Sequence, residues 1–169
     1  MHKEIKIKKE VIRLDGHLHQ ITTHSHKGKI LHKVVSPLMV EFHPRDLIQI
    51  MIGASILAIP VGFTEETWRL GEKLPLPNIF TILAVSILFI ATFVYYNYYR
   101  HHHHLREHLE EYIKRVFATY LVSLLVVAFL LTVIQITTWT GTELLISFKR
   151  VIIVAFPASM SAAVADVLK

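Results

Sequence analysis

Two adjacent glutamates at the end of the first long apolar run are the residues that most suggest chemistry. Glu65 and Glu66 follow Leu47–Thr64, a stretch without any charged side chain. A carboxylate at the end of a membrane helix is costly unless it is hydrated or paired, so its presence indicates a functional site. In a homo-oligomer, one such glutamate from each subunit forms a ring that attracts and selects cations.

Helical spacing predicts which of the two glutamates faces such a pore. Counting back from Glu66 in steps of three and four residues gives a narrow, mostly apolar stripe that contains Gly62, Ile59, Ser55 and Ile52. The face of Glu65 carries small residues instead, which favour close helix packing in lipid. We therefore expect Glu66 to line a pore and Glu65 to be structural, although a bend at Pro60 would exchange the two roles.

A second interpretation of the same glutamates is ion pairing. Lys149 and Arg150 interrupt the last apolar segment, and the expected topology puts them on the same side of the membrane as Glu65 and Glu66. Charged residues within membrane segments commonly pair with one another. The two interpretations are compatible if one glutamate forms the ion pair and the other contributes to the ring.

The last apolar segment is crowded with small residues at four-residue spacing. Small residues let helix backbones approach closely, so we expect a packing face made of Ala158, Ser159, Ala162 and Ala163. Pro157 frees a backbone carbonyl, and broken helices often border ion sites, but packing is the favoured role. Asp166 is expected near the inner surface, where water solvates it.

Histidines form a weak metal-site candidate near the N-terminus. Two His-x-His pairs each place two imidazoles on one strand face, an arrangement that suits zinc or nickel, at His17, His19, His24 and His26. No carboxylate completes a ligand set in the pattern, and the chain has no cysteine. Solvated surface histidines and pH sensing are the alternatives. No cofactor is required, and a divalent metal is the one addition that this pattern allows.

Catalytic motifs are missing from the sequence. It has no HExxH, no GxSxG, no Walker loop and no Rossmann fingerprint. Glu65 and Glu66 have no nucleophile or base within the same motif. We therefore do not expect an enzyme.

The composition predicts the elements that must position these residues. Hydrophobic residues make up 53% of the 169 residues and charged residues 18%, with a mean hydropathy of +0.46. Three stretches without charge span 18, 26 and 27 residues, namely Leu47–Thr64, Leu74–Tyr99 and Val116–Thr142. A helix needs about 20 residues to cross a bilayer. The chain is therefore expected to be an α-helical integral membrane protein.

This pattern predicts that the chain is divided into two parts. Residues 1–43 form a small, basic, His-rich head that is expected to be β-rich, because partial period-two alternation in Glu4–Leu14 is followed by an Asp-Gly turn. Residues 44–169 are expected to contain four membrane helices, at about 45–70, 78–99, 112–137 and 143–168. Pro44 suits the start of the first helix.

Basic residues predict the orientation in the membrane. The head and the 100–115 loop are rich in Lys and Arg, whereas the loop at 64–78 is net acidic. The positive-inside rule then puts both termini in the cytoplasm, with an inner or plasma membrane location. The expected partners are the lipid bilayer, further copies of this chain and inorganic ions; nucleic acid is not expected despite the pI near 9.5.

Two runs are the most distinctive in the sequence: TEETWRLGEKLP within Gly53–Asn78 and KRVIIVAFPASMSA within Lys149–Asp166. They resemble a family of integral membrane proteins from archaea and bacteria that is catalogued as a domain of unknown function. FVYYNYYR (Phe93–Arg100) and the glycine turns of Asp15–Pro37 are similar too. The resemblance implies a four-helix membrane fold and includes both candidate pairs of charged residues, but it implies no substrate or activity.

Two functional hypotheses remain. The first is an oligomeric cation pore with Glu66, or Glu65, as an outer ring and Ile52 and Ile59 as the constriction. The second is a non-conducting adaptor or sensor whose basic head binds a partner, a metal or anionic lipid. An anion pore built on Lys149 and Arg150 ranks below the cation version.

Overall fold

The computed structural model describes residues 6–14, 17–26, 29–37, 44–99 and 109–168. Contacts divide the chain into two compact units, Met1–Glu41 and Phe42–Lys169. The division falls close to the predicted boundary between residues 43 and 44.

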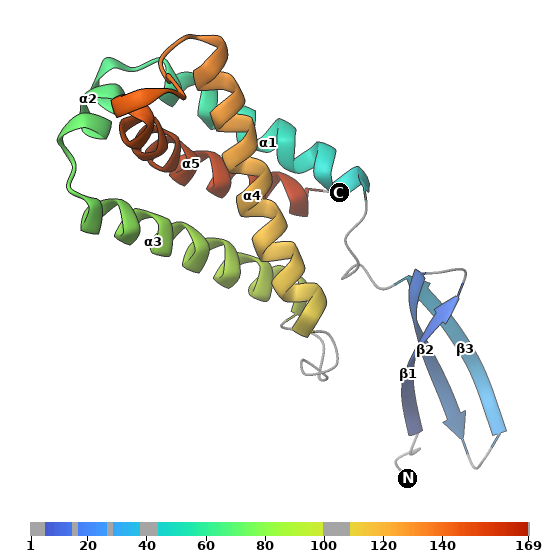
Figure 1. Cartoon of the computed structure of the whole chain (residues 1–169). Coiled ribbons are helices and arrows are strands. Elements are labelled where there is room, and N and C mark those ends of the chain that lie inside the picture. The colour runs from blue at the N-terminus through green and yellow to red at the C-terminus, as the bar shows by residue number, and fades with distance from the viewer. Residues whose placement is uncertain (1–5, 15–16, 27–28, 38–43, 100–108, 169) are drawn as a thin grey trace. The chain divides into compact units, whose positions relative to one another are not determined.

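The N-terminal unit contains a three-stranded antiparallel sheet in the order β1-β2-β3 (Figure 1). Its strands are β1 (Lys6–Leu14), β2 (His17–His26) and β3 (Lys29–Pro37). Ile21 in the central strand lies opposite Glu10 and Val35 and is buried. The run Leu38–Phe42, whose composition allows one more strand, lies outside the described residues. So small a sheet has little apolar surface with which to form a core of its own.

The second unit is helical, and four of its helices are long and apolar enough to cross a membrane. These four are α1 (Pro44–Gly62), α3 (Leu76–Val94), α4 (Leu109–Val133) and α5 (Leu144–Val167). Shorter helices are α2 (Glu65–Lys73), the π-helix η1 (Tyr95–Tyr99) and the 3-10 turn η3 (Gly141–Glu143).

The helix predicted at 45–70 is interrupted, because α1 ends at Gly62 and the separate helix α2 begins at Glu65. The hydroxyl of Thr64 bonds to the carbonyl of Val61 at 2.7 Å and to the hydroxyl of Thr67 at 2.7 Å. The indole Nε1 of Trp68 donates to the carbonyl of Gly62 at 2.7 Å. These bonds satisfy groups that a continuous helix would use internally, so Glu65 opens a separate short helix.

The predicted third helix, 112–137, also ends early. Helix α4 stops at Val133, and Gln135 adopts a left-handed φ of 60°. The side chain of Trp139 returns to donate to the hydroxyl of Thr132 at 2.8 Å. The Lys- and Arg-rich segment 100–115 lies partly outside the described residues.

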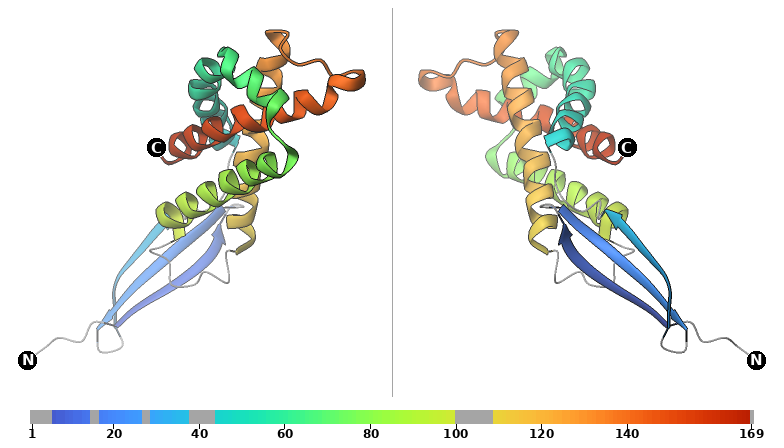
Figure 2. Two further views of the ribbon diagram at one scale, coloured as in Figure 1. Left: turned by 90° about the vertical axis from the view of Figure 1, so that its left-hand side faces the viewer. Right: turned by 90° about the vertical axis from the view of Figure 1, so that its right-hand side faces the viewer.

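Helix α5 contacts all the other long helices, and its most extensive contact is with α1, which lies beside it in Figures 1 and 2. A Cβ atom placed on Gly53 would meet the side chain of Ala165 and, at 2.9 Å, the backbone of Ala162. The expected small-residue face of α5 lies in this region, with four buried members: Ala158, Ser159, Ala162 and Ala163. Van der Waals contact between closely spaced backbones therefore holds the two helices together.

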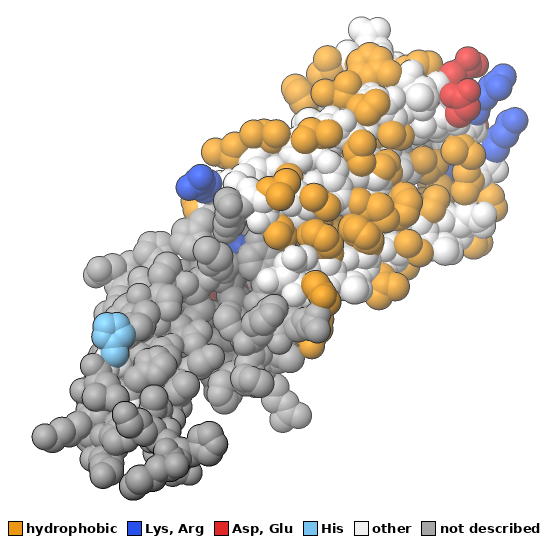
Figure 3. Space-filling view, turned by 180° about the vertical axis from the view of Figure 1, so that it is seen from behind, with side chains coloured by type: hydrophobic (Ala, Val, Ile, Leu, Met, Phe, Trp, Pro, Cys, Tyr) orange, Lys and Arg blue, Asp and Glu red, His pale blue; other side chains and the backbone are white. Residues whose placement is uncertain are grey.

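Outward-facing side chains of the bundle are strongly apolar. Helix α4 presents an exposed stripe at four-residue spacing, made of Phe117, Leu121, Leu125, Phe129 and Val133. Figure 3 shows one face of the helical unit covered with hydrophobic side chains, while acidic and basic side chains gather at one end and basic side chains lie at the other end as well. Such a surface is stable next to lipid tails and not next to water.

We expect Gly53→Val to destabilise the bundle. The added branches overlap the backbone of α5, so α1 must move away at a cost of about 1–3 kcal/mol. Thermal unfolding of the purified protein in detergent measures the loss. Ser55→Ala on the same helix is the control, because the Ser55 hydroxyl bonds only within its own helix, to the carbonyl of Met51. An unchanged unfolding temperature for Gly53→Val would contradict this close helix packing.

Candidate functional site

A buried cluster of three charged side chains lies where α1 begins, α4 begins and α5 ends. The guanidinium of Arg115 donates from Nη2 to Oδ2 of Asp46 and from Nη1 to Oδ2 of Asp166, both at 2.9 Å. The side chain of Arg115 is 0% exposed, and those of the two aspartates are at most 2% exposed. We call these three residues the Asp–Arg–Asp cluster.

Each member of the cluster is positioned by its own helix. Asp46 lies in the first turn of α1, where the positive end of the helix dipole favours a carboxylate. Arg115 belongs to a buried face of α4 that continues through Thr119 and Ser123 at four-residue spacing. Asp166 lies next to the small-residue face of α5, which lets α1 approach closely. The bundle therefore brings three distant parts of the chain together.

The cluster links three helices through charge-assisted hydrogen bonds. Burial of an ion costs several kcal/mol, and only close, well-directed bonds to opposite charges offset that cost. The planar guanidinium offers separate N–H groups to the two carboxylates, which a lysine ammonium cannot reproduce. Ionisable residues within membrane helices are rare and mark functional positions by default.

The prediction of a solvated Asp166 is wrong, since the side chain is buried and bonded to Arg115. Asp46 and Arg115 were missed altogether. Each borders a long uncharged stretch, where a charge suggests a hydrated flank. One signal was available for Arg115, because Thr119 and Ser123 follow it at helical spacing and make a polar line along an apolar helix.

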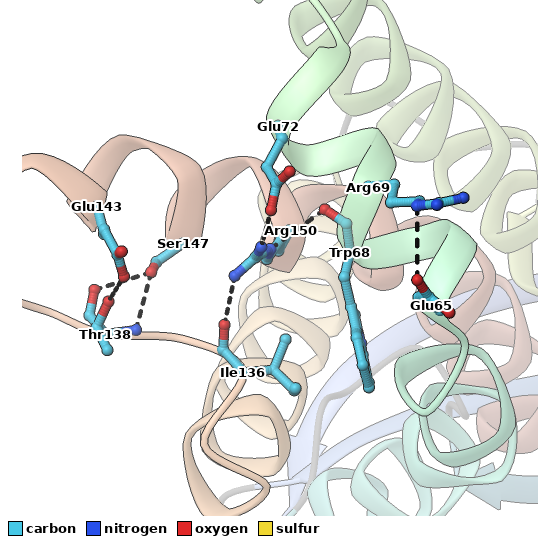
Figure 4. Close-up of polar contacts among 9 residues, drawn as sticks. All are labelled: Glu65, Trp68, Arg69, Glu72, Ile136, Thr138, Glu143, Ser147 and Arg150. Carbon is cyan, nitrogen blue, oxygen red and sulfur yellow. Dashed lines mark hydrogen bonds and ion pairs between the residues drawn. The ribbon is translucent and has the colours of Figure 1, made fainter.

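A second polar cluster, around Arg150, lies at the opposite end of the helices (Figure 4). Arg150 donates from Nη1 to the carbonyl of Ile136 at 2.6 Å and from Nη2 to Oε1 of Glu72 at 2.7 Å. Its Nε donates to the carbonyl of Trp68 at 3.3 Å. Gly71 packs directly on the aliphatic part of this side chain. Arg150 therefore ties α2 and the segment after α4 to α5.

The structure does not bring the predicted ion-pair residues together. Lys149 donates to the carbonyl of Leu74 at 2.8 Å, and Arg150 is engaged as described. Glu65 pairs with Arg69 at 3.5 Å, four residues along α2. Glu66 is exposed and has no hydrogen bond or ion pair within the described part of the chain. The separate helix α2 explains the difference, because it directs both glutamates away from α5.

The predicted pore stripe is only partly on one surface. Ile52 and Ile59 are 59% and 47% exposed, and Ser55 is half-buried. Gly62 does not belong with them, since it is buried and packs on Leu130. The break after Gly62 also removes Glu66 from this stripe, because Glu66 belongs to α2 and no longer continues the helical spacing of α1.

The four candidate histidines, His17, His19, His24 and His26, all belong to β2. Their side chains lie outside the described part of the structure. Among the described residues, no group of three or more metal-ligating side chains is close enough to hold a metal ion. Metal binding therefore stays a prediction for this strand.

Four apolar helices and buried ionic contacts define a helical integral membrane protein. A family model described as "Putative integral membrane protein (DUF2391)" matches residues 16–168. The chain belongs to this family, whose function is unknown, and the resemblance seen in the sequence is confirmed. No curated protein matches the chain, and no solved structure matches it either.

Proposed function

We propose that this protein is a homo-oligomeric membrane pore for inorganic cations, with Glu66 side chains around one mouth. The observation that carries the proposal is the exposure of Glu66 beside charged residues that are already engaged. Arg69 pairs with Glu65, Arg150 with Glu72, and Lys149 with a backbone carbonyl. Glu66 thus keeps an exposed carboxylate next to the end of α1, where a ring of such groups would concentrate cations.

The faces of α1 support an oligomer that uses its outer side. Ala54 and Ala58 are buried, so this small-residue face is already occupied within the bundle. Ile52 and Ile59 are exposed on the other side of α1 and would form an apolar constriction between subunits. Hydrophobic constrictions gate channels by excluding water. Gly62 is not part of this revised lining.

The proposed pore has a defined orientation in the membrane and needs no enzymatic activity. The excess of Lys and Arg in the head favours a cytoplasmic position, and four spans return the chain to the same side. Both termini would then be cytoplasmic in a cell membrane, with Glu66 at the outer mouth. Conduction needs no catalytic residue, so no enzymatic step is proposed.

Ion flux into liposomes that contain the purified protein tests the proposal. We expect cation flux from the wild type, with Glu66→Gln reducing the preference for K⁺ over Cl⁻ while the fold stays intact. Glu65→Gln is the matched control, because it removes the same charge from the neighbouring residue, whose partner is Arg69. The proposal would be contradicted if folded and oligomeric protein gave no flux of K⁺, Na⁺, Ca²⁺ or Cl⁻ at pH 6 and pH 8.

The second candidate is a non-conducting adaptor whose head binds anionic lipid. The small size of the sheet favours it, because Ile21 is the one buried hydrophobic residue among the described part of the strands. A sheet of this kind gains stability from a partner surface, and its lysines suit lipid phosphates. An adaptor is indifferent to Glu66→Gln. Instead, amide exchange of β1 to β3 in the full-length protein would be slower in nanodiscs of anionic lipid than in neutral ones.

A further inference from the structure

The two His-x-His pairs of β2 belong to opposite faces of the sheet. Strand β2 runs from His17 to His26, and its pairing with β1 has no irregularity. Residues along a strand alternate between the two faces, so His17 and His19 share one face while His24 and His26 share the other. The four histidines therefore do not form a single metal site. A site on either face needs a further ligand from a neighbouring strand.

The pairing of β2 with β3 supplies such a residue for the second pair. His32 in β3 is the register partner of His24. Residues directly opposite each other on antiparallel strands share a face, and their Cβ atoms are about 4.5–5.5 Å apart. His32 is exposed, and the register shifts immediately beyond this pair, between His24 and Ser25. Such bulges are common beside functional sites, where they redirect a residue.

The first pair has no comparable partner. His17 pairs with Leu14, and His19 pairs with Ile12 and Pro37. None of these partners has a side chain that binds a metal ion. Within the described strands, one set of three histidines shares a face of neighbouring strands: His24, His26 and His32.

Three histidines suit a transition metal better than a hard cation. Zn²⁺ forms tetrahedral sites with neutral imidazole nitrogens, and three histidine ligands leave the fourth position open. Lys29 pairs with His26, and its positive charge disfavours ions that are held by charge attraction alone. Calcium and magnesium also prefer oxygen ligands, whereas imidazole suits zinc, copper and nickel. The ligand chemistry of this face therefore favours a transition metal.

A bound metal would also stabilise a unit that has little core of its own. Units below about 40 residues usually need a disulfide, a metal or oligomerisation, and Met1–Glu41 is close to this size. The chain has no cysteine, and Ile21 is the one buried hydrophobic residue among the described part of the strands. A metal held by β2 and β3 joins two strands, so its binding free energy contributes to the folding of the sheet.

We propose that His24, His26 and His32 bind a Zn²⁺ ion across β2 and β3 of the N-terminal sheet, with water in the open position. The ion holds the two strands together. All three ligands belong to Met1–Glu41. The site therefore depends neither on Glu66 nor on the proposed pore.

Equilibrium dialysis of the full-length protein in detergent against ⁶⁵Zn²⁺ tests the site. The reference protein carries no histidine tag and has glutamine in place of His101–His104, because consecutive histidines also bind metals. We expect about one Zn²⁺ ion per chain. His32→Asn should weaken binding at least about 100-fold, since loss of an outer-shell group alone costs about 10–100-fold, and His26→Asn should act in the same direction. His19→Asn, on the other face, is the matched control and should bind as the reference protein does.

Amide exchange in the same samples gives a second measurement. Zn²⁺ should slow the exchange of β2 and β3 in the reference protein and in His19→Asn, but not in His32→Asn, whose exchange without metal checks its fold. The site is overturned if the reference protein shows no saturable Zn²⁺ binding, or if His19→Asn and His32→Asn lose affinity equally. Exchange that slows in anionic nanodiscs but not with Zn²⁺ would also overturn it and would support a lipid-binding head instead.

Discussion

Replacing Arg115 by leucine is expected to destabilise the helical bundle by about 3–5 kcal/mol, the usual cost of removing one partner from a buried ion pair. The change leaves Asp46 and Asp166 buried without the guanidinium that bonds to both at 2.9 Å. Because the three residues belong to three helices, the loss should loosen α1, α4 and α5 together. Thermal unfolding in detergent and the yield of monodisperse protein measure the effect.

A triple variant separates the charge effect from lost packing. Asp46→Asn, Arg115→Leu and Asp166→Asn together remove all three charges, and whole buried ion clusters are often replaced at little net cost. We expect this variant to recover most of the lost stability. Arg69→Leu is the exposed control, since the Arg69 and Glu65 side chains are 65% and 71% exposed and such pairs contribute about 0–1 kcal/mol. If the triple variant is as unstable as Arg115→Leu, the guanidinium stabilises the bundle through packing rather than charge.

The four membrane helices could be predicted from the sequence, because long stretches without charge are visible along the chain and require no knowledge of tertiary packing. The sequence was not sufficient for the break after Gly62, because Pro60 predicts a bend and the uncharged stretch Leu47–Thr64 gives no sign of a helix end at Gly62. The local sign of a new helix was nevertheless present. Thr64 followed by Glu65 and Glu66 is typical of a helix start, where carboxylates meet the positive end of the dipole.

The Asp–Arg–Asp cluster could not be predicted from local patterns. Arg115 is 69 residues from Asp46 and 51 from Asp166, and nothing in the spacing of one helix indicates its partners on two others. The partners of Lys149 and Arg150, at the other end of the helices, were predicted wrongly for the same reason. Lys149 and Arg150 were assigned to Glu65 and Glu66. In the structure Lys149 bonds to the carbonyl of Leu74, and Arg150 bonds to backbone carbonyls and to Glu72, all of which only tertiary packing brings near.

These two polar clusters suggest how the bundle tolerates a conducting role. The Asp–Arg–Asp cluster fixes α1 against α4 and α5 at one end, and Arg150 fixes α2 at the other. The outer face of α1 takes part in neither cluster. A neighbouring subunit could therefore pack on Ile52 and Ile59 without disturbing the contacts that hold each subunit together.

Reversing the charge at the proposed mouth should have the largest effect on conduction. Glu66→Lys converts a ring of carboxylates into a ring of ammonium groups, and each unit charge at about 4 Å changes the energy of an ion by about 1 kcal/mol even in water. Several subunits act together, so we expect the K⁺ to Cl⁻ permeability ratio to fall at least about tenfold and to favour Cl⁻. Reversal potentials of the reconstituted protein under a KCl gradient measure this ratio.

Glu65→Lys distinguishes a ring from a general surface potential. The two glutamates are consecutive on α2, yet Glu65 is already paired with Arg69, and both variants change the net charge equally. A pore lined by Glu66 predicts a large shift in reversal potential for Glu66→Lys and a small one for Glu65→Lys. Equal shifts would mean that ions respond to the total charge of α2 and that no ring selects them. High salt should then abolish both shifts, because exposed charges are screened within about 3 Å at 1 M ionic strength.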